Sequence, residues 1–250
     1  MTPEAIIEAL ALPPDARVSH RVPKKLLVDN GAPTPQDRRI LLDGIAELTW
    51  LASLRPSSIS VSAFRDPSRE YVEIVVLSAT LRPDAKGSRI PVLIHRALPY
   101  PVLLVTANGS ATTLSLAHKR WSQGAMDSVV LDGEVATADL TESGTAETAF
   151  IASLAVAKQP RSHLYALYQG WLDRITALAA ARLTGTFALA DTQTTSAVRR
   201  AALAEHAQVQ REITALRAQA AREKQISHRV EINLAIQRLE ERLRKLTEQL

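Results

Sequence analysis

The sequence predicts an α+β protein. We expect a mainly antiparallel or mixed sheet of about six strands with flanking helices, followed by a long C-terminal helical coiled coil. Three observations support this fold class. Apolar runs bounded by Gly and Pro alternate with amphipathic segments as far as residue 185. Two Asx-Gly dipeptides, at 108–109 and 132–133, lie between apolar runs, as in β-hairpins. Residues 196–250 contain neither Gly nor Pro. We therefore divide the chain into an α+β body, residues 1–185, and a coiled-coil tail, residues 196–250.

The first third of the chain is predicted to be mostly helical. Residues 1–12 have the spacing of a short amphipathic helix that ends at Pro13-Pro14, and residues 18–28 follow as an irregular segment. Thr34 is a good helix N-cap, with Pro35 at the first helical position. The next apolar residues are spaced by four, three and four, which predicts a helix as far as Arg55-Pro56: Leu41, Ile45, Leu48 and Ala52.

Two strands are predicted next. Residues 58–63 alternate serine with apolar residues, as in a half-buried strand, and residues 71–81 are apolar on both faces, as in a central strand. Glu73 is the exception within the second. It is either buried with a partner or solvated at a sheet edge, and the pattern favours the edge.

Residues 89–120 form the segment around which the fold is predicted. A helix opened by Ser88 leads to the corner Pro99-Tyr100-Pro101, which forces extended backbone. Strands 102–107 and 112–117 follow, joined by a type I′ turn at Asn108-Gly109. A second hairpin is predicted from strands 128–131 and 134–138 around Asp132-Gly133. Helices before and after these strands are expected to cover one face of the sheet.

The last part of the chain is predicted to be helical. Residues 148–157 and 164–183 indicate two helices, and the Thr-rich residues 186–195 join the body to the tail. The first half of the tail has apolar residues at 4-3-4 spacing: Val209, Ile213, Leu216 and Ala220. The second half continues a heptad pattern over six residues: Ile232, Ile236, Leu239, Leu243, Leu246 and Leu250.

The two halves of the tail are out of register by two residues. The join near 224–229 is either a local irregularity or the point where one half changes partner. Because an isolated helix of this length is marginal in water, the second stripe must be buried on something. It either folds back on the helices of the body or associates with other copies. The 3.5-residue spacing favours a homo-oligomer held through these six residues.

Composition limits the class of protein. The chain of 250 residues is 46% hydrophobic and has a net charge of +4. It contains no cysteine, which excludes disulfides and thiolate chemistry and fits a reducing cytoplasm. The first fifteen residues lack a basic segment, so we expect no secretory signal. No uncharged apolar run approaches membrane-spanning length. We expect a cytoplasmic protein that does not bind membranes.

No catalytic motif is present. The six histidines lack the spacing of metal ligands, and no phosphate-binding or nucleophile-elbow sequence occurs, so neither a metal nor a cofactor is expected. A restriction-type nuclease would use Glu73, Asp132 and Lys119, but Ala117 stands where the acid paired with Lys119 belongs. Four basic residues could instead contact nucleic-acid phosphates: Lys24, Lys25, Lys119 and Arg120.

Several ordered motifs resemble one bacterial family. VPKKLL at 22–27, LTWLASLRPSSISV at 48–61 and YVEIVVLSATL at 71–81 are followed by LIHRALPYPVLLV at 93–105, LSLAHKR at 114–120 and LYALY at 164–168. Together they resemble domain of unknown function 4391 over about residues 12–180, with the coiled coil as an addition. The resemblance supplies no catalytic residues. It implies neighbours that are helicases and DNA methyltransferases in phage-defence or restriction-modification gene clusters.

These observations lead to three functional hypotheses. The favoured one is a non-catalytic accessory or adaptor subunit of a bacterial phage-defence or restriction-type system, acting beside a helicase or DNA methyltransferase. The alternatives are an unusual or degenerate metal-dependent nuclease and a simple nucleic-acid-binding protein, of DNA for example, without chemistry.

Overall fold

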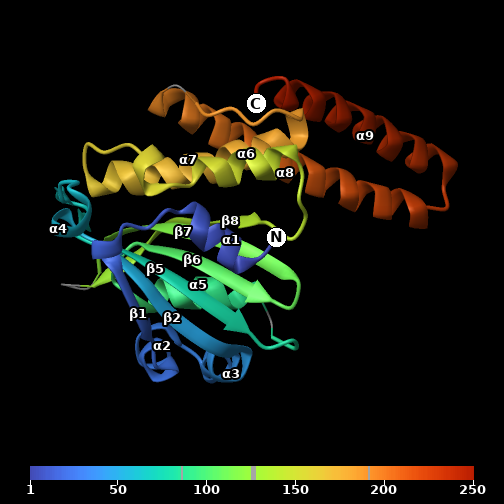
Figure 1. Cartoon of the computed structure of the whole chain (residues 1–250). Helices are drawn as coiled ribbons and strands as arrows, with labels where there is room; N and C mark the ends of the chain where they lie inside the picture. The colour runs from blue at the N-terminus through green and yellow to red at the C-terminus, as the bar shows by residue number, and fades with distance from the viewer. Residues whose placement is uncertain (86, 125–127, 191) are drawn as a thin grey trace. The chain divides into compact units, whose positions relative to one another are not determined.

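A computed structural model of the chain describes residues 1–85, 87–124, 128–190 and 192–250. These residues form two compact units, 1–175 and 176–250. The first unit contains a six-stranded sheet with flanking helices, and the second is helical (Figure 1). The predicted α+β fold class is confirmed.

The main sheet is mixed, with strand order β1-β2-β5-β6-β7-β8. Only β5 and β6 are parallel, and helix α5 lies between them in the chain. The other neighbouring strands pair antiparallel. The strands are β1 (Arg17–Arg21), β2 (Ile45–Leu54), β5 (Ile74–Leu81), β6 (Val102–Asn108), β7 (Ala111–Trp121) and β8 (Val129–Asp139). A separate two-stranded sheet pairs β3 (Phe64–Arg65) with β4 (Glu70–Tyr71).

Helices cover both faces of the sheet, whereas the sequence predicted cover on one face (Figure 1). One layer consists of α2 (Lys24–Gly31), α3 (Pro35–Gly44) and α5 (Arg89–Ala97). The opposite layer contains α1 (Pro3–Ala9), α6 (Thr145–Ser153) and the first part of α7 (Leu164–Thr184). Short elements α4 (Pro56–Ile59), η1 (Pro14–Ala16) and η2 (Val156–Lys158) complete the unit.

The central strands are buried on both faces because each face has its own helical layer. Val75 and Leu77 of β5 pack in one cluster with Leu93 of α5, while the intervening Val76 is also fully buried. On the other side the Tyr168 hydroxyl of α7 donates to the carbonyl of Val102 at 2.7 Å. Such two-sided burial explains the continuous apolar runs of the central strands.

The helix predicted from Thr34 to Arg55 ends at Gly44, and its second half is strand β2. The N-cap prediction is confirmed, since Thr34 Oγ1 accepts from the Asp37 amide at 3.1 Å. The pairing of β2 with β5 shifts register between Ile45 and Glu47 and again between Trp50 and Ala52. The first bulge places Ile45 and Leu48 in one cluster despite a spacing of three. A bulged strand therefore produced the spacing that predicted a helix.

Two other segments also differ from the sequence predictions. Residues 18–28 are not irregular, because they contain most of β1 and the start of α2. The strand predicted at 58–63 is replaced by the one-turn helix α4, which has Pro56 at its first position. Ser60 then takes a left-handed conformation, with φ of 52°, and ends the turn.

The first predicted hairpin is confirmed, with a different turn. Asn108 pairs with Ala111, so the loop residues are Gly109 and Ser110, and Gly109 has φ of 60°. Glycine at the first loop position is typical of type II′ rather than type I′.

The second predicted hairpin is absent, because β8 runs from Val129 through Gly133 to Asp139 and pairs with β7 alone. Gly133 has φ of 90° and lies at a bulge where the register shifts between Leu116 and His118. The two outer strands, β1 and β8, are both bulged, and in β1 the shift lies around Ser19, which has φ of 57°.

Gly31 allows α2 to lie close to α5. A Cβ at this position would lie 2.5 Å from Ala97 Cβ and 2.8 Å from the Leu93 carbonyl oxygen. Alanine is favoured in helices by about 1 kcal/mol, but overpacking costs about 1–3 kcal/mol or more. We expect Gly31→Ala to lower the melting temperature by several degrees in a thermal unfolding scan. Gly124→Ala should leave it unchanged, because among the described residues no atom beyond its chain neighbours lies within 4 Å of the added Cβ. Equal melting temperatures would contradict the close packing.

The second unit contains an antiparallel helical hairpin. Helices α8 (Gln193–Arg222) and α9 (Ile226–Thr247) are joined by three residues, 223–225. Val209 and Ile213 of α8 share a core with Ile232, Ile236 and Leu246 of α9. The partly buried Leu216, Ala220, Leu239 and Leu243 pack against it. Two ion pairs, Glu205–Arg242 at 2.5 Å and Arg217–Glu240 at 2.6 Å, also join the helices.

The hairpin changes the interpretation of the predicted coiled coil. The two apolar stripes are out of register because they belong to two helices that face each other, not to one continuous seam. Of the six residues assigned to self-association, five lie in or against this intramolecular core, and Leu250 lies beyond the end of α9. Burial of the stripe therefore does not require a second chain. Within the described ranges, no helix combines the length and apolar character needed to cross a bilayer.

Candidate functional site

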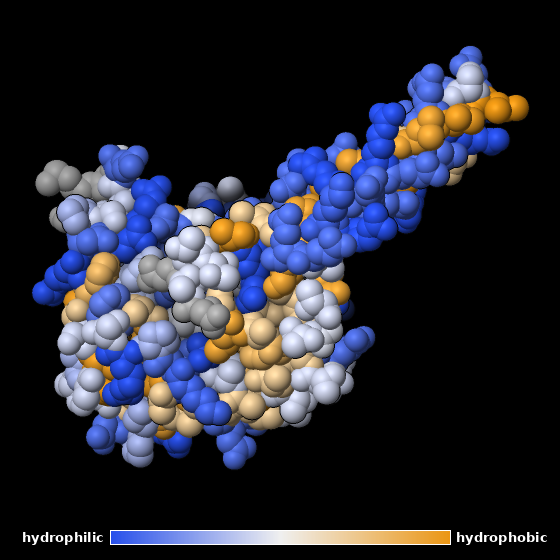
Figure 2. Space-filling view, turned by 90° about the horizontal axis from the view of Figure 1, so that it is seen from above, coloured by the Kyte–Doolittle hydropathy of each residue, from blue (hydrophilic) through white to orange (hydrophobic). Residues whose placement is uncertain are grey.

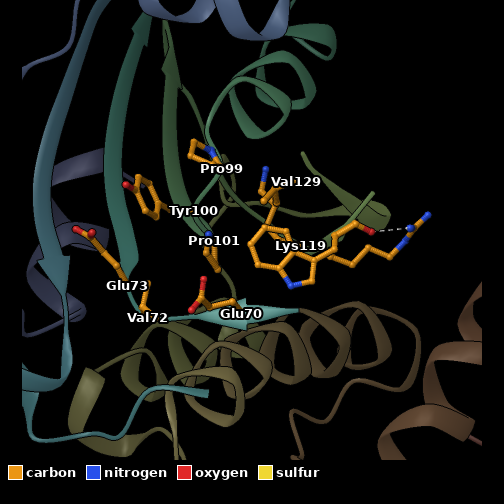
Figure 3. Close-up of a pocket in the computed structure, with 10 residues that line it drawn as sticks. Glu70, Val72, Glu73, Pro99, Tyr100, Pro101, Lys119 and Val129 are labelled. Atoms are coloured by element: carbon orange, nitrogen blue, oxygen red, sulfur yellow. Dashed lines mark hydrogen bonds between the residues drawn. The ribbon is translucent and has the colours of Figure 1, made fainter. Parts of the chain in front are cut away.

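The candidate site is a cavity of about 220 Å³ at the ends of β5, β7 and β8 (Figure 3). Glu70 and Glu73 line it from β4 and the approach to β5, and Tyr100 from the proline corner. Lys119 and Trp121 line it from the end of β7. This volume is below the roughly 300–1,000 Å³ of pockets for drug-sized ligands. The cavity has room for a small group only.

Lys119 is the most unusual residue at this cavity, because it is only 2% exposed. Its Nζ donates to the carbonyls of His95 and, at 2.8 Å, Leu98. These carbonyls lie at the C-terminal end of α5, where helical carbonyls lack partners within the helix and the dipole favours a cation. Burial lowers the pKa of Lys119 to about 8. The side chain therefore caps α5 from the sheet.

His95 lies beside this cap in the core. Its Nε2 is 3.0 Å from Ser115 Oγ, and in the described part of the chain Nδ1 has no hydrogen-bond partner. Burial, followed by the nearby charge of Lys119, lowers the pKa of His95 to about 3. The ring is neutral at physiological pH, which fits the structural role favoured for this residue by the sequence.

A chain of hydrogen bonds joins β4, β7 and α7 beside the cavity. Tyr71 Oη lies 2.6 Å from His118 Nδ1, and His118 Nε2 lies 2.8 Å from Gln169 Oε1. Gln169 Nε2 donates to Asp173 at 2.8 Å. Burial raises the pKa of Tyr71 well above 10, so the phenol stays protonated and donates to His118. His118 then carries its proton on Nε2. The sequence had assigned His118 to a solvated strand end or an anion contact.

The acidic residues considered for a nuclease are held by arginines. Glu73 is buried at 6% exposure and its carboxylate pairs with Arg55 at 3.0 Å. The prediction of a solvated edge for Glu73 is therefore wrong, because the arginine partner balances its buried charge. Asp132 pairs with Arg69 at 3.3 Å and Arg120 at 3.6 Å.

Glu73 and Lys119 share the cavity, but Asp132 is not among its described lining residues. In the described ranges, no group of three or more His, Cys, Asp or Glu side chains could hold a metal ion.

The four predicted phosphate contacts fall on two elements. Lys24 and Lys25 lie at the start of α2, whereas Lys119 and Arg120 lie at the end of β7. Lys119 is buried and its Nζ is directed to α5, while Arg120 pairs with Asp132. Lys25 is exposed. Of these four residues, only Lys24 and Lys25 on α2 remain candidates for contact with a large ligand.

The structure adds site residues that the sequence did not single out, above all Tyr71 and Gln169. One signal was available for the buried Lys119. Lys119 follows Ser115 and Ala117 at intervals of two residues, so all three side chains lie on the same face of β7. Ser115 and Ala117 are buried, which places Lys119 on a buried face as well. Nothing in the local sequence indicates the partners of Tyr71 on α7, which is distant along the chain.

The fold and this site define an α+β domain with a six-stranded mixed sheet, a lysine-capped helix at its cavity and a C-terminal helical hairpin. A family model described as domain of unknown function (DUF4391) matches residues 10–243, and the chain belongs to this family. The match extends past the resemblance at residues 12–180 and includes most of the hairpin. No curated protein and no solved structure matches the chain.

Proposed function

We propose that this protein is a non-catalytic accessory subunit of a bacterial phage-defence or restriction-type system, which docks on a helicase or DNA methyltransferase through its helical hairpin. The family resemblance supports the kind of partner, since it implies such enzymes as neighbours. The hairpin supports the docking role, because it has an apolar stripe that its own core does not use.

This second stripe is the observation that carries the proposal. Ile226, Val230 and Leu234 of α9 are spaced by four residues and remain exposed, Ile226 at 71%. They are distinct from Ile232, Ile236 and Leu246, which close the hairpin core. Figure 2 shows apolar surface along the hairpin between hydrophilic flanks. An exposed row of large aliphatic residues on a helix is a common way for a partner helix or groove to be recognised.

The end of the hairpin carries a group of exposed basic residues. Arg222, Lys224 and Arg229 are exposed and have no ion pair among the residues that the structure describes. An acidic surface on the enzyme partner would complement these basic residues.

Co-expression with a helicase and a DNA methyltransferase of the kind that the family resemblance implies, taken from the genes beside this one, tests the proposal. We expect the full-length chain to co-purify with one of them, and the double variant Ile226→Asp, Val230→Asp to lose it because two charges would enter the apolar contact. Affinity should fall at least tenfold, measured by calorimetry.

The matched control is Leu189→Asp, Val198→Asp, which changes two exposed aliphatic residues of the same unit. It should retain the partner. The proposal is wrong if neither enzyme binds the wild type at physiological salt, or if both double variants lose binding equally. Light scattering on the free protein would show whether a second copy occupies the stripe instead.

A further inference from the structure

A group of exposed or half-buried cations lies where β1, α2, α3 and β5 meet. Elsewhere in the body, arginines such as Arg55 and Arg89 pair with carboxylates. By contrast, in the described ranges no carboxylate pairs with the members of this group, which are Arg21, Lys24, Arg39 and Arg82. Cations that the fold leaves unneutralised are available for an anionic ligand.

Two hydrogen bonds bring these residues together. Lys24 Nζ, at the start of α2, donates to the Leu42 carbonyl in the last turn of α3 at 3.0 Å. The Arg82 amide, just after β5, donates to the Gly44 carbonyl at the end of α3 at 2.8 Å. Arg21 is the last residue of β1. After burial, the charges of Arg82 and then Arg21 lower the pKa of Lys24, as expected of three neighbouring cations.

A hollow of about 470 Å³ adjoins this group. Arg39 and Arg82 line it, with Gln36 as a further donor and Ile40 as an apolar wall. Asp43 and Asp84 also line it, and Asp43 is the carboxylate that partly offsets the two arginines at Lys24. The two arginines and two aspartates of the lining balance each other, and Arg21 and Lys24 beside the hollow make the local charge positive.

We propose that Arg21, Lys24, Arg39 and Arg82 bind the phosphate backbone of nucleic acid. Guanidinium groups bind phosphate oxygens in bidentate fashion, and lysine adds a point charge. Arg21, Arg39 and Arg82 are exposed and come from three different elements, which suits successive phosphates of a polymer better than one enclosed phosphate. The site shares no residue with the hairpin stripe, so its test and the docking test can fail separately.

Fluorescence anisotropy with labelled single- and double-stranded DNA tests the site in the full-length chain. We expect affinity to fall with rising salt, because each phosphate contact releases counterions. The triple variant Arg21→Gln, Lys24→Gln, Arg82→Gln should weaken binding to the duplex roughly tenfold or more. The salt slope should also fall by about 0.9 for each contact removed.

The matched control removes the same charge from exposed arginines of the hairpin that form no ion pair with any residue the structure describes: Arg211→Gln, Arg222→Gln, Arg238→Gln. It should bind like the wild type. Equal losses in the two triple variants would overturn the proposal by showing attraction to net charge alone. An absence of binding at low salt would also overturn it, and so would inorganic phosphate competing as well as DNA at equal phosphate concentration.

A second measurement does not depend on a variant. Bound DNA should protect Lys24 from acetylation, measured by mass spectrometry of the digested protein, while exposed Lys224 on the hairpin should stay reactive. Equal reactivity of Lys24 with and without saturating DNA would contradict the site.

Discussion

Replacing Ile213 with aspartate should unfold the C-terminal hairpin and leave the sheet intact. Ile213 is 1% exposed in the core shared by α8 and α9. Truncating a buried isoleucine already costs about 2–5 kcal/mol, and an unpaired buried carboxylate adds a desolvation cost. Helix α9 has 22 residues, and a helix of that length is marginal in water without its partner. The loss should therefore spread over both helices.

Circular dichroism and limited proteolysis measure this effect. The helical signal should fall by a large part of that contributed by α8, with 30 residues, and α9. New cleavage sites should appear between residues 193 and 250, while a fragment containing the sheet persists. Val198→Asp makes the same kind of change on the exposed surface of α8 and should preserve both properties. If Ile213→Asp instead halves the molecular mass and keeps its helices, the stripe is buried between chains.

Replacing Lys119 with methionine should destabilise the body and remove a pH dependence. Methionine keeps the apolar stem but leaves the carbonyls of His95 and Leu98 without the amine that caps them. An unpaired buried acceptor costs about 1–3 kcal/mol, so we expect a loss of roughly 2–5 kcal/mol at pH 10, where the wild type no longer buries a charge, and a smaller loss at pH 7. Chemical denaturation gives this difference directly.

The pH dependence follows from the lowered pKa of Lys119, about 8 against 10.5 for an ordinary lysine. Below pH 8 the amine is charged in both the folded and unfolded states, and the folded state carries the full cost of burying it. Between about pH 8 and 10.5 the folded state releases its proton first, so the unfolded state binds more protons and stability rises with pH.

From pH 7 to pH 10 the wild type should gain about 2–3 kcal/mol of unfolding free energy relative to Lys119→Met. Lys25→Met, at an exposed lysine, should follow the wild type. A constant difference between wild type and Lys119→Met across this range would show that the pKa is not lowered.

The sequence predicted the central strands because helices cover both of their faces. Strands buried on both faces are continuous apolar runs, which are easy to recognise. The sequence did not predict β2, since a bulge changed the spacing of Ile45 and Leu48 from two to three. Asp43-Gly44 was the available signal that the helix stops. The hairpin predicted at Asp132-Gly133 is wrong because a dipeptide that tolerates positive φ is suited to a bulge as well as to a turn.

The candidate site was less predictable than the fold. Lys119 and Glu73 are charged, and charged residues are rarely buried without partners, so the sequence alone favours solvent for both. Their partners are a helix end and Arg55, which lie 18 or more residues away along the chain. In the tail, the two stripes were recognisable, but their mutual orientation depended on a short break at 223–225 that contains neither Gly nor Pro.

The bulges in β1 and β8 bear on how this protein behaves at high concentration. A straight outer strand offers a row of amides and carbonyls to any other chain and is a starting point for aggregation. Here each outer strand is interrupted, at Ser19 and at Gly133, by a residue with positive φ. Arg17 and Arg21 add exposed charge along β1. Neither edge of the sheet is therefore a regular template for cross-β growth, so the sheet should resist edge-to-edge fibril formation while it stays folded.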